Sequence, residues 1–372
     1  MSKMDICLIT GTPPTNILIE KLISVLRPIV TKMVVITGNM ADDNSLDINT
    51  KIVNVGWEHP KGLLFTLVNN IFLQLRYSYH ILVKARNIKT IIYFLGGSAF
   101  PLPIIISRFM RKRIYLIVTH STSQIAKRIY PNFAISLITR SLERLNYYLC
   151  HQLIVYSPNM TKDMGLELYR NKTVIAYEHF VDFSLFYKNK EVTQRKYSIG
   201  YVGRLSEEKG IFNLLNAMLL LPPELNLIVC GDGGLRGSVE EYIQANRLND
   251  RVKLTGWIDN KCLPHFLNDM KILIIPSYTE GLANIMYEAM ACGTPVLASP
   301  VGAIPDFVRN GETGFLLKSN KPEDIASGLL KALNSPKLQE IVYNSIALTH
   351  EFFSIEKAIE RYRSVLENNH GD

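Results

Sequence analysis

Short apolar runs alternate with longer helix-patterned segments along this chain, and this alternation constrains its fold more than any other sequence feature. In the first half the runs cover residues 6–10, 33–37, 52–55, 90–94, 114–118 and 152–156. In the second half they cover 198–202, 225–229, 252–254, 272–275 and 295–298. Continuous Ile, Leu and Val runs separated by amphipathic segments, such as 16–26 and 133–149, indicate parallel sheets covered by helices. We therefore predict an α/β chain with two doubly wound sheets.

A polar stretch without periodicity divides the two series. We predict an N-terminal Rossmann-like domain over residues 1–186, a linker over 187–197 and a second Rossmann-like domain over 198–352. A last helical segment, 353–372, should pack back toward the first domain. Ligands should then bind in a cleft between the domains, where the carboxyl ends of the strands gather.

The cysteines and the apolar segments indicate the compartment. The five cysteines are scattered and lack a CxxC spacing, which favours a reducing compartment and argues against disulfides or a zinc site. Residues 90–107 carry no charge, but two glycines and two prolines interrupt them, which is more typical of a strand, a loop and a helix start than of a membrane span. The first residues do not read as a signal peptide. We expect a cytoplasmic protein.

The basic excess lies entirely in the first half. Residues 1–186 hold 21 Lys and Arg against 11 Asp and Glu, whereas the whole chain has a net charge of +8. A basic cluster over 108–113 accompanies an apolar stretch over 63–75. This combination suits peripheral contact with an anionic membrane, such as its inner face, or an anionic lipid carrier. A solvated surface that aids solubility fits the same charges. Nucleic acid is not expected, because no recognition motif accompanies them.

The most informative motif for function is Pro-Ser-Tyr-Thr-Glu-Gly-Leu-Ala-Asn-Ile-Met-Tyr-Glu-Ala-Met-Ala-Cys-Gly-Thr-Pro, residues 276–295. A helix should begin near Ala283 and end at Gly293, so that Glu280 precedes it and Glu288 lies within it. The free N–H groups at its start can bind a diphosphate while the carboxylates accept hydroxyls. The two carboxylates could instead be a glycosidase acid/base pair, and Glu280 alone could complement the helix dipole. The expected N–H donors are those of Leu282, Ala283 and Asn284.

Three other loops follow strands of the second domain. The loop after 198–202 carries Gly203, Arg204 and Lys209, and its two cations can bind two phosphates; in an ordinary solvated loop they would pair with Glu207 and Glu208 instead. The loop after 225–229 could bring its backbone against a ligand, and the loop after 252–254 could offer an apolar wall. Alternatively, the first is a flexible turn and the second holds a tryptophan that contacts no ligand. Their candidate residues are Gly231, Gly233, Trp257 and Ile258.

Together these blocks resemble the family-4 glycosyltransferases, retaining enzymes with the GT-B fold. The resemblance covers residues 198–318 and includes Gly-Ala-Ile-Pro-Asp at 302–306 and Asn-Gly-Glu-Thr-Gly at 310–314. In the first half it rests on His120 and on residues 181–186. The loop after the first strand departs from the family's Gly-Gly pattern, since Gly11 and Thr12 are followed by two prolines. The contacts that Gly11 and Thr12 make are correspondingly less defined.

The resemblance implies roles for single residues. Arg204 and Lys209 would stabilise the departing diphosphate, Glu280 would bind the donor sugar, Glu288 the ribose, and His120 the sugar from the opposite domain. It implies retaining transfer of a hexose-type sugar from a UDP or GDP donor. The basic, apolar first domain suggests a glycan or lipid-linked acceptor, and because no DxD-like metal site stands out we expect no metal or cofactor. Two alternatives stay open: a nucleotide-sugar epimerase of the same fold, and a non-catalytic partner subunit that binds nucleotide sugars.

Overall fold

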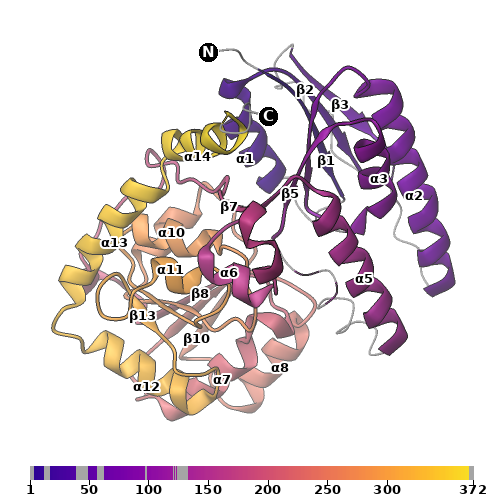
Figure 1. Cartoon of the computed structure of the whole chain (residues 1–372). Coiled ribbons are helices and arrows are strands. Elements are labelled where there is room, and N and C mark those ends of the chain that lie inside the picture. The colour runs from indigo at the N-terminus through magenta and orange to yellow at the C-terminus, as the bar shows by residue number, and fades with distance from the viewer. Residues whose placement is uncertain are drawn as a thin grey trace. The chain divides into compact units, whose positions relative to one another are not determined.

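The computed structural model describes residues 4–11, 17–38, 49–56, 63–96, 99–119, 121, 123 and 133–367, with the backbone alone for 63–68 and 134. Figure 1 shows the whole chain. It divides into two compact units: Met1–Glu178 with Ala358–Asp372, and His179–Lys357. The division thus falls before the expected linker, because residues 187–197 are part of the second unit. The chain returns to the first unit at Ala358, five residues after the expected start of the last segment.

The first unit is built on a seven-stranded, entirely parallel sheet in the order β3-β2-β1-β4-β5-β6-β7. Six strands agree with the predicted runs to within a few residues. The edge strand β7 was not predicted, because it has three residues and none of them is buried. The strands are β1 Met4–Thr10, β2 Val30–Thr37, β3 Thr50–Asn54, β4 Thr90–Phe94, β5 Arg113–Ile117, β6 Gln152–Val155 and β7 Thr173–Ile175.

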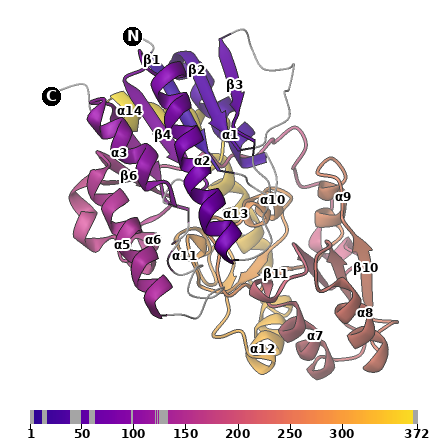
Figure 2. The same cartoon turned by 90° about the vertical axis from the view of Figure 1, so that its right-hand side faces the viewer.

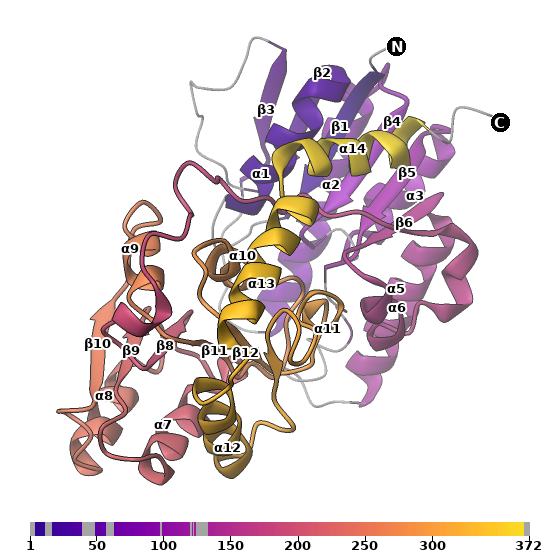
Figure 3. The same cartoon turned by 90° about the vertical axis from the view of Figure 1, so that its left-hand side faces the viewer.

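Helices form a layer on each face of this sheet. The buried side chains of Tyr77 in α2, Ile104 in α3 and Tyr147 in α5 join a core with alternate strand residues such as Ile9 and Leu116. Helices α2, α3 and α5 therefore cover one face (Figure 2), and α1 and α14 lie on the other (Figure 3). The helical segments are α1 Ile17–Leu26, η1 Arg27–Ile29, α2 Leu63–Lys84, α3 Pro101–Phe109, α5 Phe133–Leu149, α6 Pro158–Asp163, η3 Glu167–Lys172 and α14 Ile355–Glu367.

The charge-free segment 90–107 contains β4 and most of α3, so the predicted strand and helix start are confirmed. Within the residues that the structure describes, no helix combines the length and the apolar character needed to cross a membrane.

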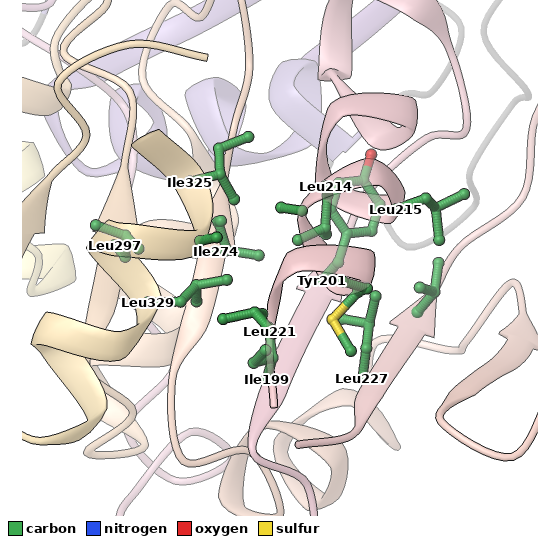
Figure 4. Packing of buried hydrophobic residues seen from close by; sticks show 14 of the residues in the cluster. Ile199, Tyr201, Leu214, Leu215, Leu221, Leu227, Ile274, Leu297, Ile325 and Leu329 are labelled. Carbon is green, nitrogen blue, oxygen red and sulfur yellow. The ribbon is translucent and has the colours of Figure 1, made fainter. Parts of the chain in front are cut away.

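The second unit contains a six-stranded parallel sheet in the order β10-β9-β8-β11-β12-β13. Strand side chains such as Ile199 and Ile274 pack against Leu214 of α7 and Leu329 of α12 (Figure 4). The two-residue strand β13 was not predicted. The strands are β8 Ile199–Val202, β9 Leu227–Cys230, β10 Val252–Gly256, β11 Leu273–Ile275, β12 Val296–Ala298 and β13 Phe315–Leu316. The helical segments are η4 Val192–Gln194, η5 Glu207–Lys209, α7 Ile211–Leu220, α8 Arg236–Ala245, α9 Leu263–Asn268, α10 Asn284–Ala291, α11 Ile304–Phe307, α12 Pro322–Leu333 and α13 Leu338–Phe352.

A buried arginine explains why the expected linker belongs to the second unit. The Arg195 guanidinium donates to the carbonyls of Met270 and Cys292, both at 2.9 Å, and to Thr294 Oγ1 at 2.6 Å. It also donates to the carbonyl of Lys190 at 3.1 Å. Burial lowers the pKa of Arg195 to about 10, so it stays charged at neutral pH. Backbone carbonyls from distant segments thus fix this stretch to the sheet.

A buried carboxyl ties the last helix to the first unit. Glu178 accepts hydrogen bonds from Tyr156 Oη at 2.7 Å and from Tyr362 Oη of α14 at 3.1 Å. Arg361, also in α14, lies over the Tyr177 ring, with 3.6 Å from its guanidinium carbon to the ring centroid. Burial raises the pKa of Glu178 to about 7, although the hydrogen bonds from the two tyrosines oppose the shift.

Replacing Arg195 by methionine should destabilise the second unit. The substitution removes every side-chain donor at this position and leaves buried carbonyls without partners, so we expect a loss of about 3–5 kcal/mol in unfolding free energy. Differential scanning calorimetry measures it. The control is Lys196→Met, at the exposed neighbouring position. Equal melting temperatures for the two variants would contradict the role given to Arg195.

Glu178 should make the stability of the first unit depend on pH. Its pKa in the folded state lies above the value of an exposed glutamate, so the stability it contributes is complete below about pH 4.5 and is lost as the pH rises through about 7. Glu178→Gln keeps a donor and an acceptor for the tyrosines but cannot ionise. Urea unfolding at pH 5 and pH 8 should show a smaller decrease for the variant than for the wild-type chain; an identical decrease would refute this.

Candidate active site

The strand order of the second sheet creates a crevice between β8 and β11. On one side of this pair the sheet continues through β9 and β10, and on the other through β12 and β13, so the loops after β8 and β11 diverge. A cavity of about 260 Å³ lies there. It is lined by Tyr201, Val202, Gly203, Arg204, Lys209, Leu263, Ile274, Ile275, Ser277, Glu280, Ala283, Asn284, Ile285 and Glu288.

The loop after β8 supplies the two cations. The Tyr201 hydroxyl donates to the carbonyl of Arg204 at 2.9 Å and so fixes the backbone of this loop. The Arg204 side chain is 58% exposed, and its Nη2 lies 3.0 Å from Glu208 Oε1. This is the pairing expected of an ordinary loop, and it leaves the other N–H groups of the guanidinium for a ligand. Lys209, by contrast, does not pair within its own loop.

Lys209 and Glu280 form an ion pair across the crevice. Lys209 Nζ lies 2.6 Å from Glu280 Oε1, and Ser277 Oγ donates to the same oxygen at 2.7 Å. Both charged side chains are mostly shielded from solvent, which strengthens their attraction. Within the described chain Glu280 Oε2 has no hydrogen-bond partner, so it can accept one from a ligand hydroxyl.

The helix after β11 begins where the motif predicted. Its first residue is Asn284, and Ala283 is its N-cap residue. Among the described residues, the backbone N–H groups of Ala283, Asn284 and Ile285 donate no hydrogen bond, and all three residues line the cavity. Glu288, in the second turn, is buried at the cavity wall. The helix start therefore offers N–H groups and a partial positive charge to an anion.

Glycines let the loops approach one another. A Cβ atom on Gly231 would lie 1.9 Å from the Gly203 carbonyl oxygen, and one on Gly233 would lie 2.4 Å from that of Leu205. Gly302, with φ +59°, lies against the backbone of Glu280, whose carbonyl oxygen would be 2.1 Å from a Cβ there. These glycines are thus required for the packing of the loops that hold the cavity residues.

Seven of the expected residues line the cavity: Gly203, Arg204, Lys209, Glu280, Ala283, Asn284 and Glu288. Leu282 is buried beside them without lining it, and Gly231 and Gly233 support the loop after β8. Trp257 and Ile258, after β10, lie outside the cavity, and Trp257 is 73% exposed. His120 and Thr12 lie outside the described residues. Gly11 lies in the first unit, where its N–H donates to the Leu95 carbonyl at 2.8 Å.

Sequence reasoning missed two polar residues of the cavity. Ser277 donates a hydrogen bond to Glu280. The sequence feature that could have identified it is its position directly after Pro276, where strand β11 ends and the loop begins. Tyr201 lies within β8, and its apolar surroundings in the sequence gave no sign that its hydroxyl fixes the next loop.

The cavity is equipped for an elongated ligand with an anionic part and hydroxyl groups. Cations and helix N–H groups can bind the anion, and carboxylates can accept from the hydroxyls. In the part of the chain that the structure describes, no three His, Cys, Asp or Glu side chains come together as metal ligands would.

Comparison with known proteins shows what the part of the chain that holds this arrangement is similar to. Residues 184–347, which contain the whole cavity, match the family described as glycosyl transferases group 1. An uncharacterized glycosyltransferase of Methanocaldococcus jannaschii is 32% identical over 186 residues, which are 48% of this chain and 47% of that protein. This chain thus spans about half the length of the curated relatives it matches first.

Solved structures establish the fold. The Anabaena protein HepE in complex with UDP is 18% identical over 98% of this chain and all of that chain, with a TM-score of 0.77. Sucrose-phosphate synthase of Thermosynechococcus elongatus is 20% identical over 98% of this chain and 99% of that chain, with a TM-score of 0.79. The fold is therefore GT-B, with two Rossmann-like domains, as predicted.

The close approach at Gly302 can be tested against a matched glycine. Gly302→Ala adds both the strain of a positive φ and a clash with the backbone of Glu280, whereas Gly311, with φ +77°, has open space around its Cβ position. Gly311→Ala should cost about 1–2 kcal/mol, the strain alone. Gly302→Ala should lower the melting temperature of the second unit by several degrees more. Equal shifts would show that the loop does not depend on this contact.

Proposed function

We propose that this chain, whose residues 184–347 match the glycosyl transferases group 1, is a glycosyltransferase that moves a hexose-type sugar from a nucleoside diphosphate sugar with retention of configuration. The observation that carries the proposal is the cavity at the β8/β11 crevice. It joins two cations, unengaged helix N–H groups and two carboxylates within one space. This combination matches a donor with a diphosphate between two hydroxyl-bearing sugars.

The diphosphate is assigned to the positive side of the cavity. The N–H groups of Ala283, Asn284 and Ile285 bind oxygens of one phosphate, and Arg204 and Lys209 bind the other. As the bond to the sugar breaks, negative charge grows on the departing diphosphate. Groups that are held in place before the reaction stabilise this charge without reorganising. The chain's own cations would then take the part that a metal ion plays elsewhere, and no cofactor is needed.

The hydroxyl groups are assigned to the carboxylates. Glu280 Oε2 accepts from a hydroxyl of the donor sugar, and Glu288 accepts from the ribose. Lys209 and Ser277 already bind the other oxygen of Glu280, which orients the carboxylate and lowers its nucleophilicity. We therefore propose that Glu280 positions the sugar, and that the acceptor attacks from the side of the leaving diphosphate. Trp257 and Ile258 stay candidates for contact with the base, and His120 for contact with the sugar.

A glycan or a lipid-linked sugar is the proposed acceptor. Support comes from a cavity of about 300 Å³ in the first unit, beside the carboxyl end of β3. Its lining includes Asn69, Phe72 and Arg76, which offer an amide, an aromatic face and a guanidinium. Arg76 also donates to the Val55 carbonyl at 3.3 Å, which holds it at the cavity. A sugar can stack on the ring and bond to the polar groups.

Two other functions use the same donor site. An epimerase would convert the nucleotide sugar without an acceptor, and a non-catalytic subunit would bind it without converting it. The ordered Lys209–Glu280 pair and the charge-stabilising groups favour catalysis over binding alone. Consumption of nucleotide sugar that requires an acceptor separates the transferase from both.

Nucleotide binding should stabilise the chain and depend on Arg204. We expect UDP or GDP, and their sugars, to raise the melting temperature, with an affinity at least tenfold lower in Arg204→Ala and Glu288→Gln because each loses a donor contact. The matched control is Arg309→Ala: this side chain is 53% exposed and pairs with Glu312 at 3.0 Å, but it does not line the cavity. Thermal-shift titrations with UDP, GDP and ADP measure these affinities.

The outcomes separate the parts of the proposal. Absence of stabilisation by every nucleotide would overturn the donor assignment, and equal affinities in the wild type and both cavity variants would overturn the residue roles. With the donor that binds, turnover in the presence of EDTA tests metal independence. The anomeric configuration of the product, read by NMR, tests retention.

A further inference from the structure

The exposed apolar side chains gather on three neighbouring helices of the first unit. Helix α3 packs between α2 and α5, and the three cover one face of the sheet (Figure 2). Of the 22 large apolar side chains exposed in the described chain, 13 lie on these helices, on the side away from the sheet. They are Ile71, Phe72, Leu75, Tyr79, Leu82, Val83, Phe109, Phe133, Leu137, Ile138, Leu142, Leu145 and Tyr148. We call this surface the α2–α3–α5 face.

The charges on the same face have one sign. The exposed basic side chains on the three helices are Arg76, Lys84, Arg108, Arg140 and Arg144. Their single acidic residue, Glu143, is buried, and it accepts from Ser121 Oγ at 3.1 Å and Ser123 Oγ at 2.6 Å. It is also the sole acidic residue in the sequence between Glu58 and Asp163. The face therefore combines a broad apolar surface with uncompensated positive charge.

Helix α5 shows how the two kinds of side chain are interleaved. Leu137, Arg140, Arg144 and Tyr148 follow one another at spacings of three and four residues, so they share one side of the helix. A long arginine side chain can lay its methylene groups along neighbouring apolar surface and extend its charge outward. This arrangement is typical of helices that lie in the interface between water and lipid.

Charge decides between the possible occupants of this face. In a symmetric dimer the same patches meet, so arginines would face arginines with no acidic side chain to compensate them. Nucleic acid offers phosphates, but its phosphate surface would leave the aliphatic side chains of Leu137 and Ile138 without an apolar partner. An anionic bilayer provides partners for both the arginines and the apolar side chains, since lipid headgroups bind the arginines and the acyl boundary receives the apolar side chains.

We propose that the α2–α3–α5 face docks the first unit on the surface of a bilayer that contains anionic lipids. The three helices lie along the interface and none crosses it. The proposal rests on the surface of the first unit alone, so it stands or falls separately from nucleotide binding in the second. Phe72 and Arg76 also line the proposed acceptor cavity, so the test below uses α5 residues, which do not line it.

Co-sedimentation with vesicles tests this docking. The full chain should bind vesicles of phosphatidylcholine with 30% phosphatidylglycerol, with little binding to phosphatidylcholine alone and with release as NaCl rises from 0.05 to 0.5 M. Removing two charges in Arg140→Ser/Arg144→Ser should lower the partition coefficient about thirtyfold. Leu137→Asn/Ile138→Asn should lower it about tenfold, because less apolar surface enters the interface.

Matched variants in the second unit serve as controls. Lys253→Ser/Lys331→Ser removes two exposed charges, and Leu219→Asn/Leu220→Asn replaces two apolar side chains that are about half exposed. Both should bind vesicles like the wild type, and unchanged melting temperatures show that all variants are folded. Equal binding to neutral and anionic vesicles, or equal losses in the control variants, would overturn the proposal. A dimer that the α5 variants abolish, without vesicle binding, would instead make this face a self-interface.

Discussion

The reversal of strand order between β8 and β11 is the constraint on which the candidate site depends. Parallel strands end at one edge of the sheet, and at a reversal the loops from two neighbouring strands turn in opposite directions. The strand order therefore produces the crevice regardless of which residues form the loops. The loops then supply chemistry to it: cations from the β8 loop, and a carboxylate and a helix start from the β11 loop.

Buried charges elsewhere follow a common rule. Arg195 donates to backbone carbonyls and to a threonine hydroxyl, and the buried Lys112 ammonium donates to the carbonyls of Ala85 and Ile88 at 3.1 and 2.7 Å, near the end of α2. Neither needs a buried carboxylate, so the cost of removing a second ion from water is avoided. Each instead satisfies carbonyls that the ends of helices and strands leave open. These two side chains thus hold together the segments that frame each sheet.

The two units handle surface charge differently. In the loops after β8 and β9 of the second unit the exposed arginines have acidic partners: Arg204 has Glu208, and Arg236 has Asp232 and Glu240. On the α2–α3–α5 face the exposed charges are all positive. A site whose arginines are already paired with carboxylates can select a small anion by geometry, because only a well-placed phosphate competes with those carboxylates. An uncompensated face attracts any extended anionic surface.

The sequence by itself determined the fold class, most strands and the start of α10, because burial on both sheet faces and helix termination leave local patterns. It also identified seven residues of the cavity, since each lies either in a loop that follows a predicted strand or in the first two turns of the helix that the motif predicted. The short edge strands β7 and β13 lacked such a pattern. Tertiary structure alone decided that Lys209 pairs with Glu280, 71 residues away, and that Arg195 binds Thr294, 99 residues away. These partners meet because the sheet places distant segments side by side, and spacing along the chain carries no record of that adjacency.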